Sequence, residues 1–365
     1  TSFRGDASQM TGAGLGTDGS ANTSGIITAT AFVPSQGQLS HRNIIVNGAM
    51  NVAQRGVSST STGFGCVDRF QVSYSGTDEA PTQAQASVAS GTTPYSLGFR
   101  KLFKITNGNQ TSGAGATDHI QTVYAIEDQD LSTSGWNYTS SSSYVTLSFY
   151  IKSSIAQNFY FYLQSDNGSQ YRYVMETGSL SADTWTKVTK TISGNSNIVL
   201  NSDNGVGMYL VYSLFDGTDR TGTRPLNAWA ALDNTSRTPD QTSTWYTTND
   251  STWEITGVQL EVGPVATPFE QRSIGDELAR CHRYYQQYTN IMSHGFVPNN
   301  GSRSYSHAFT FPVEMRAAPT LTLTNTGSSG GQYVTDGNTN VNITTLNSAV
   351  NNTKNPEWYP FLSGD

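Results

Sequence analysis

The chain has 365 residues and a formal net charge of −7, and only 13% of its residues are charged. That fraction is about half of the roughly 25% found in ordinary globular domains, which excludes a charged disordered tail and a coiled-coil rod. Ser, Thr, Asn and Gly supply the polarity instead, and aromatic residues reach 11%. This composition is typical of all-β surface proteins, whose strands alternate an apolar face with a polar face.

The charge pattern and the hydropathy pattern argue against two classes of partner. An acidic balance without any run of Lys or Arg disfavours binding to nucleic acid. No stretch approaches 18 apolar residues, so we expect no membrane insertion, and the first residues lack the features of a signal peptide. We therefore expect the sequence to be a piece of a longer protein. Cys66 and Cys281 have no CxxC spacing, which predicts two buried free thiols.

Residues 1–40 contain an internal repeat with an offset of 29 positions. Its shared positions are Thr1, Phe3, Gln9, Met10 and Thr11, which recur as Thr30, Phe32, Gln38, Leu39 and Ser40. So few apolar residues cannot be buried by their own chain, which predicts the end of a shaft in which several chains wrap together. A flexible linker is the alternative. In the shaft interpretation Phe3, Met10, Phe32 and Leu39 contact neighbouring subunits.

Residues 41–272 are predicted to form a jelly-roll β-sandwich. Between residues 144 and 151, apolar residues alternate with polar and aromatic ones, which predicts a strand with one core face. Similar runs at 159–163 and 171–175 flank a turn at 166–168 and predict a hairpin. Gly257 lies where the alternation changes phase, which predicts a β-bulge. No helical period precedes residue 273, so we expect two stacked sheets, with a barrel as the alternative.

Residues 273–290 are predicted to form a short helix that Ser273 caps and that ends near Gln287. Its apolar positions repeat about every 3.5 residues and are Ile274, Leu278, Cys281, Tyr285 and Tyr288. The stripe is explained equally well by packing on the sandwich or by a helix–helix seam, in which Ile274, Leu278 and Tyr285 would contact another subunit. Residues 291–365 predict a small C-terminal β domain, too small to be stable alone.

No catalytic motif occurs in the sequence, which lacks HExxH, GxSxG, the P-loop and GxGxxG before a helix. Glycosidases need only two facing carboxylates, so Asp68 and the acidic stretch Glu127, Asp128 and Asp130 remain candidates. Carboxylates in strand–turn regions are far more often turn formers, and we expect no catalytic residue. The five histidines have no ligand spacing, so no metal site and no cofactor are expected, although turn oxygens could hold a structural Ca²⁺.

Aromatic residues are the remaining candidates for binding. Two groups are predicted to contact a glycan. The first is four tyrosines interpreted as lying on the polar strand face, Tyr160, Tyr162, Tyr171 and Tyr173. The second comes from the polar stretch 215–251 and consists of Trp229, Trp245 and Tyr246. Rings beside amides and carboxylates suit a sugar, whose C–H face is apolar and whose hydroxyls form hydrogen bonds. The alternative is that these tyrosines line a subunit interface.

Three stretches resemble the receptor-binding tail fibres and fibre-like adhesins of bacteriophages, especially short-tailed marine phages. The first runs from His41 to Gly56, with Asn47, Gly48, Met50 and Gln54-Arg55-Gly56, and is followed by Asp68-Arg69-Phe70. The second runs from Trp253 through Glu261 and Arg272 to Tyr285, and the third is 311–320. Residues 3–12 are similar to the shaft repeats of such fibres.

The resemblance implies a homotrimeric virion appendage whose jelly roll is related in shape to carbohydrate-binding modules. Such modules often carry a structural Ca²⁺ near the first and last strands, where this chain offers Asn47 and Glu261 but no carboxylate beside Asn47. The metal is therefore not carried over, and the resemblance supplies no catalytic motif.

We expect a non-enzymatic virion protein, a tail fibre that is made in the host cytoplasm. It would bind host-surface polysaccharide through several weak sites and attach to other tail proteins through a missing N-terminal part. Two alternatives stay open. One is a polysaccharide depolymerase or endoglycosidase, and the other is a purely architectural capsid or tail fibre without a receptor.

Overall fold

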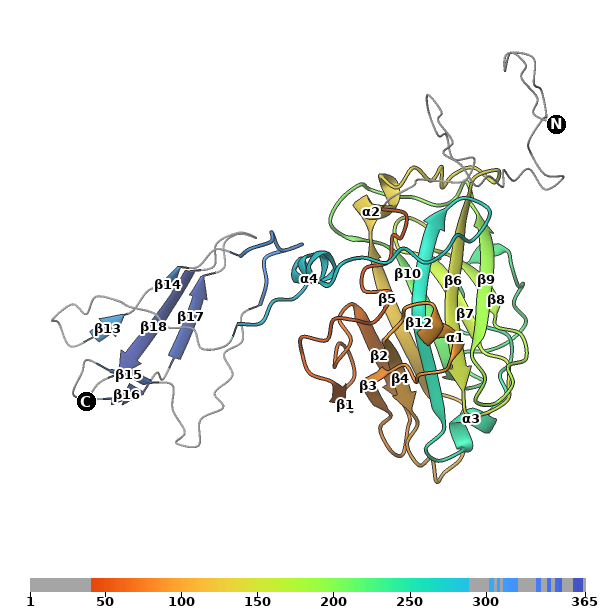
Figure 1. Ribbon diagram of the computed structural model, residues 1–365, viewed down its shortest axis with the longest axis horizontal. Coiled ribbons are helices and arrows are strands. Elements are labelled where there is room, and N and C mark those ends of the chain that lie inside the picture. Colours follow the sequence, from red (N-terminus) through yellow and green to blue (C-terminus); the bar gives the residue numbers. More distant parts are fainter. Residues whose placement is uncertain are drawn as a thin grey trace, which may run out of the picture. The chain divides into compact units, whose positions relative to one another are not determined.

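Two antiparallel sheets form the main body of this computed structural model, which describes residues 41–288 and 311–320 together with the backbone of six short strands between 302 and 363. Sheet A has the strand order β1-β3-β4-β12-β6-β9, and sheet B has the order β11-β8-β7-β10-β5-β2. The sheets stack face to face with β12 in the middle of sheet A (Figure 1). The predicted all-β jelly-roll sandwich is confirmed, and the alternative of a closed barrel is wrong.

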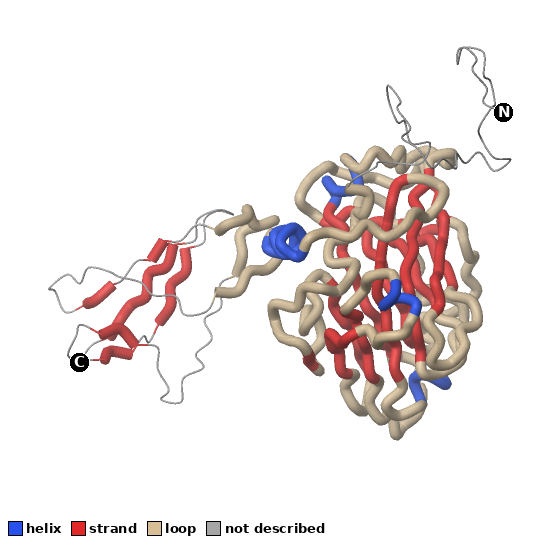
Figure 2. The backbone as a smooth tube through the Cα atoms, in the orientation of Figure 1, coloured by secondary structure: helices blue, strands red, loops and turns tan. Residues whose placement is uncertain are grey.

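The strands of sheet A are β1 (Ser58–Ser59), β3 (Thr82–Ser87), β4 (Lys101–Thr106), β6 (Tyr144–Ser153), β9 (Thr186–Ser193) and β12 (Thr252–Val262). Those of sheet B are β2 (Phe70–Ser75), β5 (His119–Glu127), β7 (Tyr160–Ser165), β8 (Tyr171–Glu176), β10 (Val206–Asp216) and β11 (Trp229–Ala231). The helices are α1 (Thr93–Ser96), α2 (Asp128–Ser132), α3 (Thr244–Thr247) and α4 (Ile274–His282). Loops join most of these elements (Figure 2).

The strands toward the C-terminus are β13 (Ser302–Ser304), β14 (His307–Ala308), β15 (Tyr333–Thr335), β16 (Asn340–Asn342), β17 (Thr345–Ala349) and β18 (Glu357–Ser363). Three of them, β13, β14 and β17, pair with β18, and β15 pairs with β16. This strand content agrees with the β structure predicted for this part of the chain.

The core lies between the inner faces of the two sheets. In β6, Val145, Leu147, Phe149 and Ile151 are all fully buried, as the alternation predicts. The ring of Phe149 meets the edges of Phe161 from β7 and Tyr212 from β10, each at 5.1 Å between centroids. Burying each such side chain stabilises the fold by about 1.5–3 kcal/mol relative to exposure. These aromatic contacts join the two sheets near their centre.

Two local predictions about turns and thiols are confirmed. β7 and β8 form an antiparallel hairpin whose loop contains Gly168 in a left-handed conformation, with φ of 63°. Cys66 and Cys281 are both buried and both free. In the part of the chain that the structure describes, no helix combines the length and the hydropathy of a membrane span.

The predicted helix begins as expected but ends early. The side chain of Ser273 accepts a hydrogen bond from the Asp276 backbone N–H, which caps α4. The helix then ends at His282, so the predicted end near Gln287 is wrong. Backbone bonding continues for a few residues, since the Tyr285 N–H donates to the Cys281 carbonyl at 3.1 Å, and the side chains of Arg283 and Tyr284 donate to Glu127, as described below.

The predicted bulge in β12 is also confirmed. The register between β12 and β6 shifts between Thr256 and Gln259, and Gly257 between them has φ of +65°. A Cβ atom on Gly257 would lie 2.6 Å from Cζ of the buried Phe99. Two constraints therefore select glycine here: the left-handed backbone and the close approach of a ring.

We predict that Gly257→Ala lowers the free energy of unfolding by about 3 kcal/mol, because it combines backbone strain with overpacking. Gly91→Ala is the matched control, since Gly91 has φ of +83° but no atom within 4 Å of the added Cβ. It is expected to cost about 1 kcal/mol. Urea unfolding measures both values. Equal losses for the two variants would contradict the contribution assigned to Phe99.

Candidate functional site

Part of the outer face of sheet B is covered by the chain itself. Tyr162, Val174 and Val211 project from β7, β8 and β10 and form an apolar cluster away from the main core. Leu226, from the connection between β10 and β11, packs against this cluster. Tyr162 is only 2% exposed. The surface around Tyr162 is therefore closed to a ligand.

The positions of the predicted glycan contacts correct much of the aromatic hypothesis. Trp245 and Tyr246 lie in the main core, so the prediction that these two rings contact a glycan is wrong. The prediction that Tyr173 contacts a glycan is also wrong. Tyr173 pairs across the hairpin with Leu163 and, like Leu163, points into the core. Tyr162 points outward as predicted, but it is buried, and the guanidinium carbon of Arg172 lies 4.4 Å from its ring centroid.

The other three candidates are half-buried. Trp229 packs edge-on against Tyr173 at 5.3 Å, and its indole N–H donates to the Ser193 carbonyl, so its ring already has partners. Tyr160 lies on the outer face of β7. Tyr171 begins β8 two positions before Tyr173 and shares its inward phase, so the expectation that Tyr171 lies on the polar face is wrong. For Tyr160 and Tyr171, glycan contact stays a prediction.

Another part of the outer face carries a cavity of about 290 Å³, which we call the Arg–Tyr pocket. Its lining residues come from five separate segments: Arg55, Phe64, Asp68, Arg69, Gln71, Ala125, Glu127, Gly205, Val206, Tyr209, Cys281, Tyr284, Tyr285 and Arg316. Gln71, Ala125 and Tyr209 belong to three neighbouring strands, β2, β5 and β10. A rigid sheet therefore supplies one wall, and the segment after α4 supplies another.

A buried carboxylate holds the wall that follows α4. Glu127, at the end of β5, accepts two hydrogen bonds from Arg283, at 2.5 and 2.9 Å, and one from the Tyr284 hydroxyl at 2.7 Å. Gln129 donates a further hydrogen bond to it. The Glu127 side chain is fully buried. Burial acts to raise the pKa of this carboxyl, but the bonds from Arg283 and Tyr284 outweigh it and hold the pKa below its usual value.

The second carboxylate in the pocket is equally engaged. Asp68 accepts hydrogen bonds from the backbone N–H and the side-chain amide of Gln54, at 3.0 and 2.5 Å. Arg55 forms an ion pair with it at 3.8 Å. Burial raises the pKa of Asp68, and the hydrogen bonds from Gln54 offset this only in part. Both carboxylates are thus used to hold segments of the chain together.

Two arginines stack on the two tyrosines of the second wall. The guanidinium carbon of Arg55 lies 3.5 Å from the centroid of the Tyr285 ring, and that of Arg69 lies 3.4 Å from the centroid of Tyr284. Phe64 lies 5.3 Å from the same carbon of Arg55 and is 40% exposed, so it forms part of the rim. Such cation–π contacts contribute about 0.5–2 kcal/mol each.

The backbone of Arg69 is strained, with φ of 75° in the left-handed region that favours glycine. A conformation of this kind costs about 1–3 kcal/mol and persists only where the surroundings impose it. Here the side chain is held by the Tyr284 ring and by a hydrogen bond to the Ala125 carbonyl. Arg69 lies in the turn that a hydrogen bond from the Phe70 N–H to the Val67 carbonyl closes, at 3.3 Å, and from this turn the Asp-Arg-Phe motif supplies a buried cation to the pocket.

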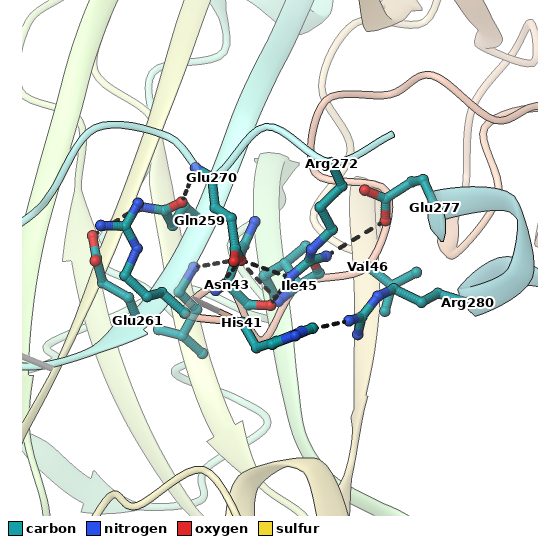
Figure 3. A network of polar contacts seen from close by, with 12 residues as sticks. His41, Asn43, Ile45, Val46, Gln259, Glu261, Glu270, Arg272, Glu277 and Arg280 are labelled. Atoms are coloured by element: carbon teal, nitrogen blue, oxygen red, sulfur yellow. Dashed lines mark hydrogen bonds and ion pairs between the residues drawn. The ribbon is translucent and has the colours of Figure 1, made fainter. Parts of the chain in front are cut away.

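A polar network next to α4 fixes the first described residues against the last strand of the sandwich (Figure 3). The Asn43 side chain accepts from the backbone N–H groups of Ile45 and Leu260, at 3.0 Å each, and donates to the Val258 carbonyl. Glu270 accepts from the Asn43 backbone N–H at 2.9 Å. The first and second stretches that carry the family resemblance are therefore packed against one another.

Arg272 continues this network toward α4. Its guanidinium donates to the carbonyls of Asn43 and Ile45 and forms ion pairs with Glu270 and Glu277, at 3.1 and 3.6 Å (Figure 3). Figure 3 also shows the His41 ring beside Arg280 of α4, at 3.0 Å. The helix is thereby fixed to the sandwich before it leads into the Arg–Tyr pocket.

Asn47 and Glu261, which lie where carbohydrate-binding modules often carry a structural Ca²⁺, form hydrogen bonds with other groups of the chain. The Asn47 side chain bonds to the Val52 backbone N–H and to the carbonyls of Val52 and Asp68. Glu261 accepts from Thr267 and Gln259. Among residues 41–288 and 311–320, no three His, Cys, Asp or Glu side chains gather as a metal site requires. A structural Ca²⁺ has no support from this donor set.

The predicted subunit contacts divide into three groups. Leu278 packs against Val46, Val52 and Cys281 of its own chain, and Tyr285 stacks on Arg55. Ile274 is 62% exposed, so its contact with another subunit stays a prediction. The four repeat residues Phe3, Met10, Phe32 and Leu39 lie outside the described residues.

Comparison with known proteins finds similar solved structures but no matching sequence family. No protein-family profile and no curated protein matches the sequence. Among solved structures, the chain is similar to the enzymatically active domain of tailspike protein 4 of bacteriophage CBA120, with 11% identity and a TM-score of 0.32 over 60% of this chain. It spans 21% of that tailspike chain.

Two sugar-binding proteins are also similar to this chain. One is a putative sugar-binding protein from Bacteroides thetaiotaomicron, with 15% identity, a TM-score of 0.32, and coverage of 60% of this chain and 99% of the other. The other is a family 11 carbohydrate-binding module from Clostridium thermocellum in complex with a mixed-linked tetrasaccharide. Its identity is 12% and its TM-score 0.26, with coverage of 55% and 91%.

The sequence predicts little of the Arg–Tyr pocket. Asp68 and Glu127 are the candidate carboxylates, and the structure brings both to one cavity. Arg55, Arg69 and Tyr284 lie in the stretches that carry the family resemblance, which assigns them no role in binding. The usable signal was that the short motifs around these residues are rich in Arg and Tyr, the pair of residue types that stack on one another.

We predict that Glu127→Gln lowers the free energy of unfolding at pH 7 by about 3 kcal/mol, because it leaves Arg283 with an uncompensated charge. The folded-state pKa of Glu127 lies below its unfolded value, so its contribution is present above the unfolded pKa and is lost as the pH falls through the folded pKa. The loss caused by the variant should therefore shrink between about pH 5 and pH 3.

Glu254→Gln is the matched control, because Glu254 forms an ion pair with Lys152 on sheet A and its side chain is 10% exposed, against 0% for Glu127. It should cost about 0–1 kcal/mol. Thermal unfolding followed at several pH values measures both variants. A cost of Glu127→Gln that stays constant down to pH 3 would contradict the role given to the ionised carboxylate.

Proposed function

We propose that this chain is a non-enzymatic structural protein of a phage particle that binds a host-surface saccharide in the Arg–Tyr pocket. The observation that carries the proposal is the pocket itself. Aromatic side chains, Phe64, Tyr209 and Tyr285, line a cavity of about 290 Å³ together with groups able to form hydrogen bonds. Ligand sites are concave and mostly apolar, with a few well-placed polar groups.

The pocket suits a sugar because its two kinds of lining match the two kinds of sugar surface. An aromatic ring packs against the apolar C–H face, while its polar edge and nearby amides reach the hydroxyls. Tyr209 and Gln71 supply both kinds of group from the rigid strands β10 and β2. A preformed site of this kind loses little conformational entropy on binding.

The alternative of a glycosidase is favoured by one feature. Asp68 and Glu127 line the same cavity, and their pKa values are shifted in opposite directions. Such pairs are used as general acid and as base or nucleophile. Here each carboxylate already accepts several hydrogen bonds from its own chain, and neither is positioned for a water or a sugar oxygen. These contacts favour binding without cleavage.

Attachment in this proposal depends on several copies acting together. Three weak sites in a homotrimer, and several fibres on each particle, raise the overall avidity by about 10²–10⁴ without a tight single site. The protein would be made in the host cytoplasm and located in the virion, bound to other tail proteins. A purely architectural fibre is the remaining alternative. It would not compete with phage for adsorption to host cells.

We predict that Phe64→Ala weakens binding to host polysaccharide about tenfold, equivalent to about 1.4 kcal/mol, because it removes an exposed ring from the rim. Tyr144→Ala is the matched control, since Tyr144 is a similarly exposed ring on sheet A. Binding to a glycan array and competition with phage adsorption are the two measurements.

Loss of binding in Tyr144→Ala, with Phe64→Ala and Tyr209→Ala unaffected, would contradict the pocket as the binding site.

Incubation of the parent protein with host capsule or lipopolysaccharide tests the enzyme alternative. Release of reducing ends that is abolished in Asp68→Asn would overturn the non-enzymatic proposal.

The homotrimer is tested by sedimentation of the full chain at micromolar concentration. We expect a species of three chains, and we expect that Phe3→Ser combined with Phe32→Ser dissociates it, because the repeat supplies few other apolar groups. Val57→Ser is the control, since Val57 is an exposed apolar residue of the sandwich. A parent protein that sediments as a single chain would contradict the trimer.

A further inference from the structure

We propose that the Arg–Tyr pocket selects an acidic saccharide, one whose carboxylate or sulfate group is bound by Arg69 and Arg316. This inference rests on the proposed function, because it names the class of sugar that the same pocket takes. It depends on the charges that line the cavity, on the state of each charged group, and on one buried donor without a partner.

The cavity lining carries more uncompensated positive charge than negative charge. Three arginines, Arg55, Arg69 and Arg316, line it together with two carboxylates. Glu127 is neutralised by Arg283, which lies outside the lining, and Asp68 by Arg55. In the described part of the chain, neither Arg69 nor Arg316 forms an ion pair. This excess lies in a protein whose net charge is −7, so it is not a general property of the surface.

Arg69 supplies a buried cation to the lining. It is only 8% exposed, and its buried Nε–H has no hydrogen-bond partner among the described residues, as is also true of Arg42, Arg224, Arg237 and Arg272, which do not line this cavity. Leaving a buried donor unsatisfied costs about 1–3 kcal/mol, and more for a charged group. The rings of Tyr124 and Tyr284 lie 4.9 and 3.4 Å from its guanidinium carbon. Because those rings occupy the guanidinium faces, an additional ligand would be held at the edge, through N–H groups in the plane.

Arg316 provides a second, more accessible cation. Its guanidinium donates to the Asn204 carbonyl at 2.6 Å, and its backbone N–H donates to the Arg283 carbonyl at 2.8 Å. These two bonds fix the residue at the pocket while leaving other guanidinium N–H groups unengaged by the described residues. Arginine binds carboxylate and sulfate oxygens through two parallel N–H bonds, roughly twice as strong as bonds between neutral groups.

The two carboxylates of the lining do not repel such a ligand strongly. The side chains of Asp68 and Glu127 are 2% and 0% exposed, and their oxygens accept bonds from Gln54, Arg283 and Tyr284. Their charges are therefore screened by donors that lie closer than a ligand in the cavity would. The groups left to interact with a ligand are cations and rings.

The test compares acidic sugars with neutral versions of the same sugars. The probes are oligosaccharides of galacturonate, glucuronate and mannuronate, their methyl esters, and sulfated and unsulfated galactose oligomers. Isothermal titration with the full chain should show at least one acidic probe bound about tenfold or more tightly than its neutral form. The affinity for that probe should fall as NaCl rises, because salt screens ion pairs. The carboxylate and sulfate arms identify which anion is preferred.

Arg316→Gln should reduce the ratio of acidic-probe affinity to neutral-probe affinity at least fivefold. Arg69→Gln is a second variant with the same expectation, and its thermal unfolding shows whether it still folds. Lys187→Gln is the matched control, since Lys187 is an exposed cation on β9 and its loss changes the net charge equally. This control should keep the full preference.

The outcomes separate the inference from the proposed function. Equal or tighter binding of the neutral probes would overturn the acidic-sugar inference and leave saccharide binding standing. An acidic preference that Arg316→Gln and a folded Arg69→Gln both retain would overturn the assignment to these arginines. Absence of binding to every acidic and neutral probe at millimolar concentration would contradict the proposed function and the inference together.

Discussion

The buried carboxylate of Glu127 is the contact on which the described site depends. It lies at the end of β5, where the sheet presents a rigid edge, and it accepts bonds from Arg283 and Tyr284 just after α4. A charge buried this deeply is stable only when it is paired and hydrogen-bonded. These bonds hold the segment that follows α4 at the sheet, where Tyr284 and Tyr285 line the pocket. The same contact therefore builds one wall of the pocket.

The sandwich was predictable from the sequence because alternation is a local signal. From Val145 to Ile151 apolar residues alternate with polar ones, which identifies the core side of β6, and the phase change at Gly257 marks the bulge. In β8 the residues from Tyr171 to Met175 do not alternate in this way, so the sequence does not show which side Tyr173 faces. Trp245 and Tyr246 were misjudged because a polar stretch can still send two rings into the core.

The pocket was not predictable because its walls come from segments far apart in the sequence. No local pattern indicates that Arg55, Arg69 and Arg316 surround one cavity, since that depends on how β2, β5 and α4 pack. The stretches that carry the family resemblance include many of these residues. In the structure most of their polar groups bind other parts of the same chain, as Asn43 and Arg272 do. Their pattern reports how the fold is held together, and the pocket is formed as a result.

The connection that places Leu226 over Tyr162 and Val211 limits how a polysaccharide can approach sheet B. The outer surface around Tyr162 is already occupied by the chain itself. In the proposed function, a saccharide reaches the described surface at the Arg–Tyr pocket, a recess beside the segment that follows α4. Such a recess admits a chain end or a branch more easily than the middle of an extended polymer. Under that proposal, the density of branches on a cell surface, more than polymer length, would set how many copies of the protein engage.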